Sequence, residues 1–183
     1  MDKGFLPLTT ANWDDFMDLF GAHGAYGGCW CMFWRQTRKE FSQNCGEHNK
    51  LALKALVDEG IVPGILAYQD GKAIGWVSIA PREDYGSLER SRILKRIDDQ
   101  PVWSIVCFYA SKEQRGNLMA TLIDYAVAYA REKGAKIIEA YPSRSGSHVQ
   151  ATELYMGRLS TFLAAGFEEQ VSAGSKVIMR KFL

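Results

Sequence analysis

Residues 109–119 form the part of the chain best suited to bind a charged ligand. They read Tyr-Ala-Ser-Lys-Glu-Gln-Arg-Gly-Asn-Leu-Met, a polar turn between a run of high β-propensity and a run with helical spacing. The first N–H groups of a helix have no partner within it and lie at the positive end of its dipole. The turn therefore predicts an anion site that suits pyrophosphate, although an ordinary strand–helix loop with hydrated amides explains these residues equally well.

A second group of reactive side chains is Cys29, Cys31, Cys45 and His48. Thiolates and imidazole are the ligands of tetrahedral zinc. However, the first two cysteines are separated only by the bulky Trp30, a tighter spacing than the usual zinc knuckle. We therefore favour buried, reduced thiols and expect no metal, with a zinc-stabilised interaction module as the alternative.

Three elements must position the polar turn. Residues 102–109 predict a central strand because they are apolar on both faces, and residues 118–133 predict a helix that Gly134 ends. Residues 137–141 predict the next strand, stopped by Pro142. The turn is thus expected within a β–α–β unit.

The remaining periodicities predict further strands and helices around this unit. They are a strand at 5–8, a helix capped by Thr9 or Thr10 and ending at Phe20, a helix at 47–58 with Leu51, Ala55 and Leu56 facing inward, a hairpin of strands 64–69 and 73–79 around Asp70-Gly71, a helix at 155–165 and a strand at 176–182. The fold class is therefore α/β (α+β), a mixed sheet with helices on its faces.

Composition narrows the classes of function. The 183 residues suit a single domain spanning 1–183, and the formal net charge of +1 gives no field that would gather nucleic acid or an anionic membrane. No apolar run approaches the roughly 20 residues of a membrane span, and the first residues lack a signal-peptide pattern. We expect a cytoplasmic protein that uses neither nucleic acid nor membrane as a partner.

The polar turn resembles the cofactor motif of the GNAT N-acetyltransferases, Gln/Arg-x-x-Gly-x-Gly/Ala. Gln114 takes the first place, and Asn117 and Met119 replace the two small residues. Three further landmarks resemble the family in order: Glu139-Ala140-Tyr141-Pro142, residues 162–167 and the final strand. The resemblance covers the chain from about Val62 onward.

The resemblance implies a mostly antiparallel sheet in which the central strand splays from its neighbour, and acetyl-CoA as co-substrate. Pantetheine would lie between the splayed strands, and an amine would attack the thioester directly. The residues implied in cofactor binding are Cys107, Phe108, Tyr109, Gln114, Arg115, Gly116, Asn117, Leu118 and Met119.

The resemblance is less definite about the acid and the base. Many relatives carry a tyrosine acid where this chain has Phe162, so Tyr155 and Tyr141 are the candidates. Glu139 shares a strand face with apolar neighbours, which would raise its pKa and suit it as the base, but a structural carboxylate bracing the strands is equally compatible. A base acting through water also remains open, as do three other carboxylates, Glu83, Asp84 and Glu89.

Residues 29–35 resemble a Cys-Trp-Cys-Met-x-Trp-Arg block of a bacterial subset of the family. Residues 21–60 would then form an arm over the acceptor side, where Trp30, Trp34 and Arg35 could shape a pocket for a flat or anionic acceptor. Core packing of the arm is the alternative. The implied function is an acetyl-CoA-dependent N-acetyltransferase acting on a small-molecule amine or free amino group, and a homodimer is compatible with the aromatic arm and the C-terminal strand. The competing hypothesis is a catalytically silent CoA-binding sensor or scaffold.

Overall fold

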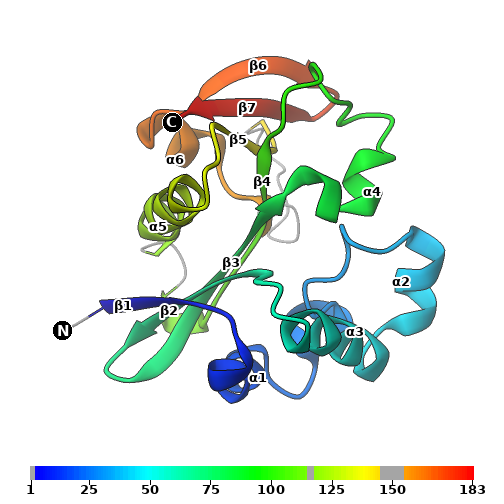
Figure 1. Ribbon diagram of the computed structural model, residues 1–183, viewed down its shortest axis with the longest axis vertical. Helices are drawn as coiled ribbons and strands as arrows, with labels where there is room; N and C mark the ends of the chain where they lie inside the picture. Colours follow the sequence, from blue (N-terminus) through cyan, green and yellow to red (C-terminus); the bar gives the residue numbers. More distant parts are fainter. Residues whose placement is uncertain (1–2, 115–117, 145–154) are drawn as a thin grey trace.

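The computed structural model describes residues 3–114, 118–144 and 155–183, which contain one seven-stranded sheet with the order β1-β2-β3-β4-β5-β7-β6 (Figure 1). The strands are β1 (Lys3–Pro7), β2 (Gly64–Gln69), β3 (Lys72–Pro81), β4 (Trp103–Ala110), β5 (Ile137–Ala140), β6 (Glu168–Ala173) and β7 (Lys176–Phe182). The helices are α1 (Trp13–Phe20), α2 (Arg38–Asn44), α3 (Glu47–Asp58), α4 (Gly86–Glu89), α5 (Met119–Glu132) and α6 (Leu159–Ala164).

The sheet is mixed but mostly antiparallel, as predicted. Only the β4–β5 pair is parallel among the strand pairs of the described residues. A parallel pair needs a crossover connection, and α5 supplies it. In Figure 1, α5 and α6 lie on one side of the sheet, and α1, α3 and α4 lie on the other. In the described part of the chain, no helix combines the length and apolar character needed to cross a bilayer.

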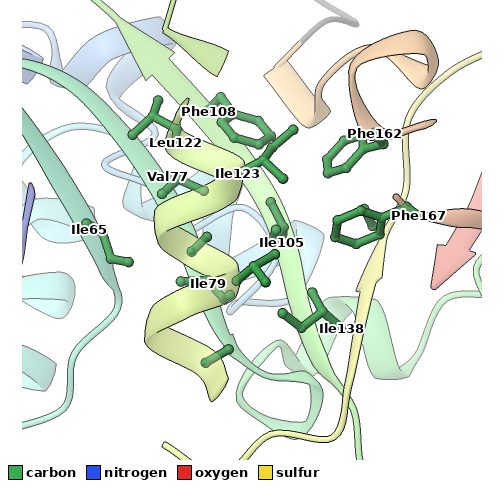
Figure 2. Packing of buried hydrophobic residues seen from close by; sticks show 14 of the residues in the cluster. Ile65, Val77, Ile79, Ile105, Phe108, Leu122, Ile123, Ile138, Phe162 and Phe167 are labelled. Atoms are coloured by element: carbon green, nitrogen blue, oxygen red, sulfur yellow. The ribbon is translucent and has the colours of Figure 1, made fainter. Parts of the chain in front are cut away.

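One hydrophobic core lies between the sheet and α5 (Figure 2). Helical spacing puts Leu122, Ile123 and Ala126 on one face of α5, where they pack on the central strands. Phe162 of α6 and Phe167 close the far end, with ring centroids 5.1 Å apart. This core fixes α5, and with it the start of the helix, against the sheet.

The opposite face of the sheet carries two further clusters. The first packs α1, α3 and the chain around Trp30 onto the β1–β3 end, and its members include Phe16, Phe20 and Trp76. The second packs residues 85–94 onto β3, β4, β6 and β7, with Tyr85 and Tyr141 fully buried. The half-buried side chain of Cys107 packs against both clusters, so it marks where they meet.

Several predicted elements are confirmed almost to the residue, and the turn chemistry explains why. Asp70 and Gly71 have φ values of 51° and 77°, the left-handed pair that a tight hairpin requires. Gly134, with φ of 87°, follows the end of α5 as predicted. Thr9 caps the helical segment before α1 by accepting a hydrogen bond from the Ala11 N–H.

Other expectations were wrong. The buried face of α3 carries Asn49, Leu53 and Val57, whereas Leu51 is 57% exposed, so the inward face was misassigned. Helix α6 begins at Leu159, later than predicted. Strand β6 and helix α2 were not predicted. Neither has an apolar face to reveal it, because five of the six residues of β6 are exposed and α2 buries none.

Gly64 permits a close approach of β2 and β3. A Cβ atom there would lie 2.3 Å from the Val77 carbonyl oxygen and 2.6 Å from the Trp76 ring. We expect Gly64→Ala to lower the free energy of unfolding by about 1–3 kcal/mol, because the strands must separate to admit the methyl group. Urea unfolding would measure this. Gly4→Ala is the matched control, since its Cβ would find only ordinary contact at 3.9 Å; equal losses in both variants would contradict the prediction.

Candidate functional site

Strand β4 carries a bulge at the point where it leaves β5. Ile105 pairs with Ile79 of β3 and Cys107 pairs with Ser78, so Val106 is an extra residue on β4. A bulge bends its strand and increases the local twist. The ladder to β5 involves only residues 103–105, whereas pairing with β3 continues to Ala110. The predicted splay is therefore visible in the pairing pattern.

The bulge also changes which way the side chains of β4 point. Ile105 and Phe108 both belong to the core under α5, although they are three residues apart. Val106 and Cys107 both contact the opposite face. The three predicted cofactor-binding residues of β4 thus face different sides. Phe108 faces Phe162 at a centroid separation of 6.1 Å, whereas Cys107 and Tyr109 pack toward α1 and its cluster.

The start of α5 lies beside the end of the β2–β3 hairpin. Leu118, the N-cap residue, has no side-chain hydrogen bond to the helix and is 1% exposed. It packs where Gly75 of β3 has no side chain, since a Cβ there would lie 2.2 Å from Leu118 Cδ2. The Gln114 amide donates to Gln69 Oε1 at 3.2 Å, tying the preceding turn to the end of β2.

The predicted cofactor residues are therefore only partly described. Leu118 and Met119 pack against or within the α5 core, and Gln114 makes a contact within the protein. The predictions for Arg115, Gly116 and Asn117 lie outside the described residues.

Glu139 is surrounded by two arginines. Its carboxylate accepts from Arg82 Nη1 at 2.9 Å and from Arg180 Nε at 2.9 Å, and all three side chains are at most 3% exposed. Arg180 is its cross-strand neighbour on β7. The expectation of apolar neighbours was therefore wrong, and the contacts favour the bracing role that the sequence left open.

Tyr141, the second tyrosine candidate, belongs to the same buried network. Its hydroxyl donates to Glu139 Oε2 at 2.7 Å and lies 2.7 Å from Ser104 Oγ. Burial, and next the negative charge of Glu139, hold the pKa of Tyr141 well above its usual value. Arg82 and Arg180 extend the network to Glu89 and Asp98, at 2.6 Å each. These contacts lock residues 82–98 onto β5 and β7.

Tyr155 lies at a different place, close to the splay of β4. It packs against the same cluster as Trp34 and Cys107. Burial, and next the charge of Cys107, raise the pKa of Tyr155. Tyr155 therefore stays protonated near neutral pH. Of the two predicted tyrosines, it is the one beside the diverging strand.

A pair of thiols lies beside Tyr155. Interaction between the Cys31 and Cys107 thiols lowers the pKa of Cys31 and raises that of Cys107. The Trp76 indole N–H also donates to Cys31 Sγ, at 3.1 Å. Of the other predicted zinc ligands, Cys29 is near enough to interact with both thiols, whereas Cys45 is exposed and its thiol donates to the Phe41 carbonyl. No group of three candidate ligands in the described ranges could hold a metal ion.

The arm separates the three predicted acceptor residues. Trp30 is 5% exposed, belongs to the α1 cluster and stacks on Phe20 at 5.8 Å, which is core packing. Trp34 packs instead against the cluster of residues 85–94, and the Arg35 guanidinium lies 4.7 Å from the Tyr85 ring centroid. The structure thus brings Trp34 and Arg35 to the side of Cys107 and Tyr155.

Sequence reasoning missed three residues of the buried network, Arg82, Arg180 and Ser104. The sequence did give a sign that Arg180 is unusual, since it directly follows the apolar run Val177-Ile178-Met179 inside a predicted strand. A charged residue in such a place is rarely buried without a partner. Arg82 and Ser104 had no distinguishing pattern, because their partners come from distant parts of the chain.

Comparison with known proteins places these features in a family. A model described as the acetyltransferase (GNAT) family matches residues 28–158. A search of curated proteins gives no match. Among solved structures, the chain is similar to the PaiA N-acetyltransferase of Thermoplasma acidophilum in complex with coenzyme A, with 15% identity, 100% of both chains covered and a TM-score of 0.58.

Two further structures show the same likeness. For an acetyltransferase of the GNAT family from Listeria monocytogenes, the identity is 14%, the coverage 99% of this chain and 95% of the other, and the TM-score 0.59. For the ribosomal-protein-alanine N-acetyltransferase of Brucella melitensis, the identity is 16%, the coverage 98% of this chain and 99% of the other, and the TM-score 0.53. At these identities the likeness is one of fold.

Proposed function

Because the chain belongs to the GNAT acetyltransferase family, whose model spans more than half of it, we propose that it transfers an acetyl group from acetyl-CoA to a small-molecule amine or free amino group. The single observation that carries this proposal is the divergence of β4 from β5 after Ile105. Past that point the β5-facing main-chain groups of β4 have no ladder partner in β5. Unpaired strand amides are the groups that an extended pantetheine chain can use.

The two ends of acetyl-CoA would be held differently. Pantetheine lies along residues 107–109, and the diphosphate lies at the turn before α5, at the positive end of that helix. Residues 115–119 supply the amides in this proposal. A main-chain N–H of β4 near Phe108 polarises the thioester carbonyl, an interaction that strengthens as charge develops on the oxygen.

Proton transfer is assigned to residues on the arm side of β4. A neutral amine attacks the thioester carbon directly, and the carbon–sulfur bond breaks to release the thiolate. We assign Tyr155 as the acid that protonates this thiolate, because it is half-buried beside Cys107 and stays protonated.

Glu139 and Asp84 are both candidates for the base. The contacts of Glu139 with two arginines make it the weaker candidate, and we therefore favour Asp84. Partial burial raises the pKa of Asp84, although Arg35 opposes the rise. Glu83 and Glu89 pair with Arg96, whereas no ion pair of Asp84 occurs among the described residues. A carboxylate with a raised pKa and no ion pair can accept the amine proton, directly or through water.

Tyr155→Phe tests the acid. We expect kcat to fall by about 100-fold or more, with the Kd for CoA unchanged, because the substitution removes only the proton donor. Steady-state kinetics and calorimetry would measure the two quantities. Tyr141→Phe is the matched control and should mainly lower stability, since its hydroxyl is confined to the buried network. A larger loss of kcat in Tyr141→Phe than in Tyr155→Phe would reverse the assignment.

The proposed function itself is tested by thiol release from acetyl-CoA in the presence of a panel of primary amines, with calorimetry of CoA binding alongside. We expect CoA to bind and thiol release to depend on an amine. CoA binding without amine-dependent release would favour a silent sensor or scaffold. If folded protein shows no heat with CoA, the assignment of the splay as a pantetheine site is wrong.

A further inference from the structure

The side chain of Arg35 carries buried polar atoms that nothing described in the protein satisfies. Its Nε and Nη2 atoms are inaccessible to solvent and have no hydrogen-bond partner among the described residues. The neighbouring Trp34 Nε1 shares this condition. Leaving a charged donor buried and unpaired is costly, so such atoms in a native protein call for an explanation.

The guanidinium is nevertheless held in place. Its carbon lies 4.7 Å from the centroid of the Tyr85 ring, a cation–π contact. The Tyr85 ring is itself fixed, because it is fully buried and its hydroxyl lies 3.0 Å from Ser78 Oγ. The backbone is anchored as well, since the Ser87 N–H donates to the Trp34 carbonyl at 2.9 Å. A fixed guanidinium loses little freedom when it binds a ligand.

Arg35 is also close to the proposed site of transfer. Ser78, which contacts Tyr85, is the cross-strand neighbour of Cys107 on β4. Tyr155 and Trp34 pack against the cluster that contains Tyr85. A ligand bound by Arg35 therefore lies on the acceptor side of β4, near the residues assigned to proton transfer.

The charges around Arg35 indicate which ligand fits. The Arg35 charge acts to lower the pKa values of Asp84, Tyr85 and Cys31, and Asp84 lies beyond ion-pair distance among the described contacts. A neighbouring carboxylate disfavours a dianion such as phosphate. The Nε and Nη2 atoms form a planar two-donor edge, which matches the two oxygens of a single carboxylate.

We propose that Arg35 binds the carboxylate of the acceptor, so that the physiological acceptors are amino-acid-like molecules carrying both a primary amine and a carboxylate. This proposal rests on the proposed acetyltransferase function and specifies its substrate class. The carboxylate binds to the Nε–Nη2 edge of Arg35, and the amine is thereby directed toward the thioester. Arg35 is then a determinant of specificity rather than a participant in proton transfer.

The test uses matched acceptors that differ only at the carboxyl group. Each of the common L-amino acids is compared with its amide and its decarboxylated amine, and aminoalkyl phosphonates serve as the phosphate-like arm. For the preferred acid, we expect kcat/KM to exceed that of its amide by about 10- to 100-fold. Arg35→Gln should remove this preference through KM, while the Kd for CoA stays unchanged. Arg35→Lys should restore it only in part, because lysine lacks the planar edge. Arg92→Gln, at an exposed arginine, is the control.

Binding provides a readout that does not depend on turnover. In the presence of CoA, the preferred amino acid should raise the Tm of the wild type and of Arg92→Gln but not that of Arg35→Gln. If neutral amines are acetylated as well as acids by the wild type, the carboxylate proposal fails while the proposed function stands. If an acid stabilises the protein through Arg35 but no amine is acetylated, the function fails and the carboxylate site stands. A preference for phosphonates, or one that survives in Arg35→Gln, would also overturn the proposal.

Discussion

Glu139→Ala is expected to lower the free energy of unfolding by about 3–5 kcal/mol. The substitution leaves the guanidinium groups of Arg82 and Arg180 without the carboxylate that joins them, and both are at most 3% exposed. Arg82 keeps Glu89 and Arg180 keeps Asp98, but the buried donors that faced Glu139 are left unsatisfied. The Tyr141 hydroxyl loses its acceptor as well. The loss is therefore larger than that of an ordinary side-chain truncation.

Urea unfolding of the variant and the wild type would measure this loss. The matched control is Glu169→Ala, which removes a carboxylate 2.7 Å from Arg144 in a pair whose side chains are 37% and 48% exposed. An exposed pair contributes at most about 1 kcal/mol. Similar losses in the two variants would show that the buried network does not hold the sheet together.

Glu139→Gln separates bracing from catalysis at the same position. The amide keeps the shape of the carboxylate but carries no charge between the two arginines. If Glu139 braces the strands, stability falls and the remaining folded protein keeps most of its kcat. If it is instead the base, kcat falls by about 100-fold or more while the unfolding curve stays close to that of the wild type.

Asn117→Pro is expected to nearly abolish binding of CoA. Proline has no N–H, and the sequence places this residue in the turn whose amides are proposed to face the diphosphate. Calorimetry with CoA would measure the effect on protein whose unfolding curve shows that it is folded.

Two milder variants serve as controls for this prediction. Asn117→Ala keeps the N–H and should weaken binding far less than proline does. Gln114→Ala should weaken CoA binding modestly, because the substitution removes the hydrogen bond that ties the turn to Gln69. Equal affinity for CoA in the wild type and Asn117→Pro would refute the assignment of the diphosphate to this turn.

The elements that could be predicted are those whose pattern is local. The Asp70-Gly71 turn determines the hairpin, and the spacing of apolar residues determines α5. The face of α3 was misassigned because apolar residues occur on more than one side of it, and only tertiary packing selects Leu53 and Val57. Strand β6 is exposed, so no alternation of apolar residues marks it.

The site was predictable only where a residue's role follows from its own strand or turn. The splayed strand was expected from the family resemblance, and the pairing of β4 agrees with it. The surroundings of Glu139 could not be foreseen, because Arg82 is 57 positions away and Arg180 is 41 positions away along the chain. Likewise, nothing in the sequence separates Trp30, a core residue, from Trp34 near Tyr155.

The bulge at Val106 determines which side chains lie on each face of β4. In an uninterrupted strand of alternating side chains, Cys107 would share a side with Ile105 and would lie under α5, while the Phe108 ring would occupy the arm side. The same sequence paired without a bulge would therefore put a thiol beside the Phe162 ring and a phenyl group against the tyrosine assigned as proton donor. The bulge thus lies where the sheet divides and determines which side chains each face of β4 presents.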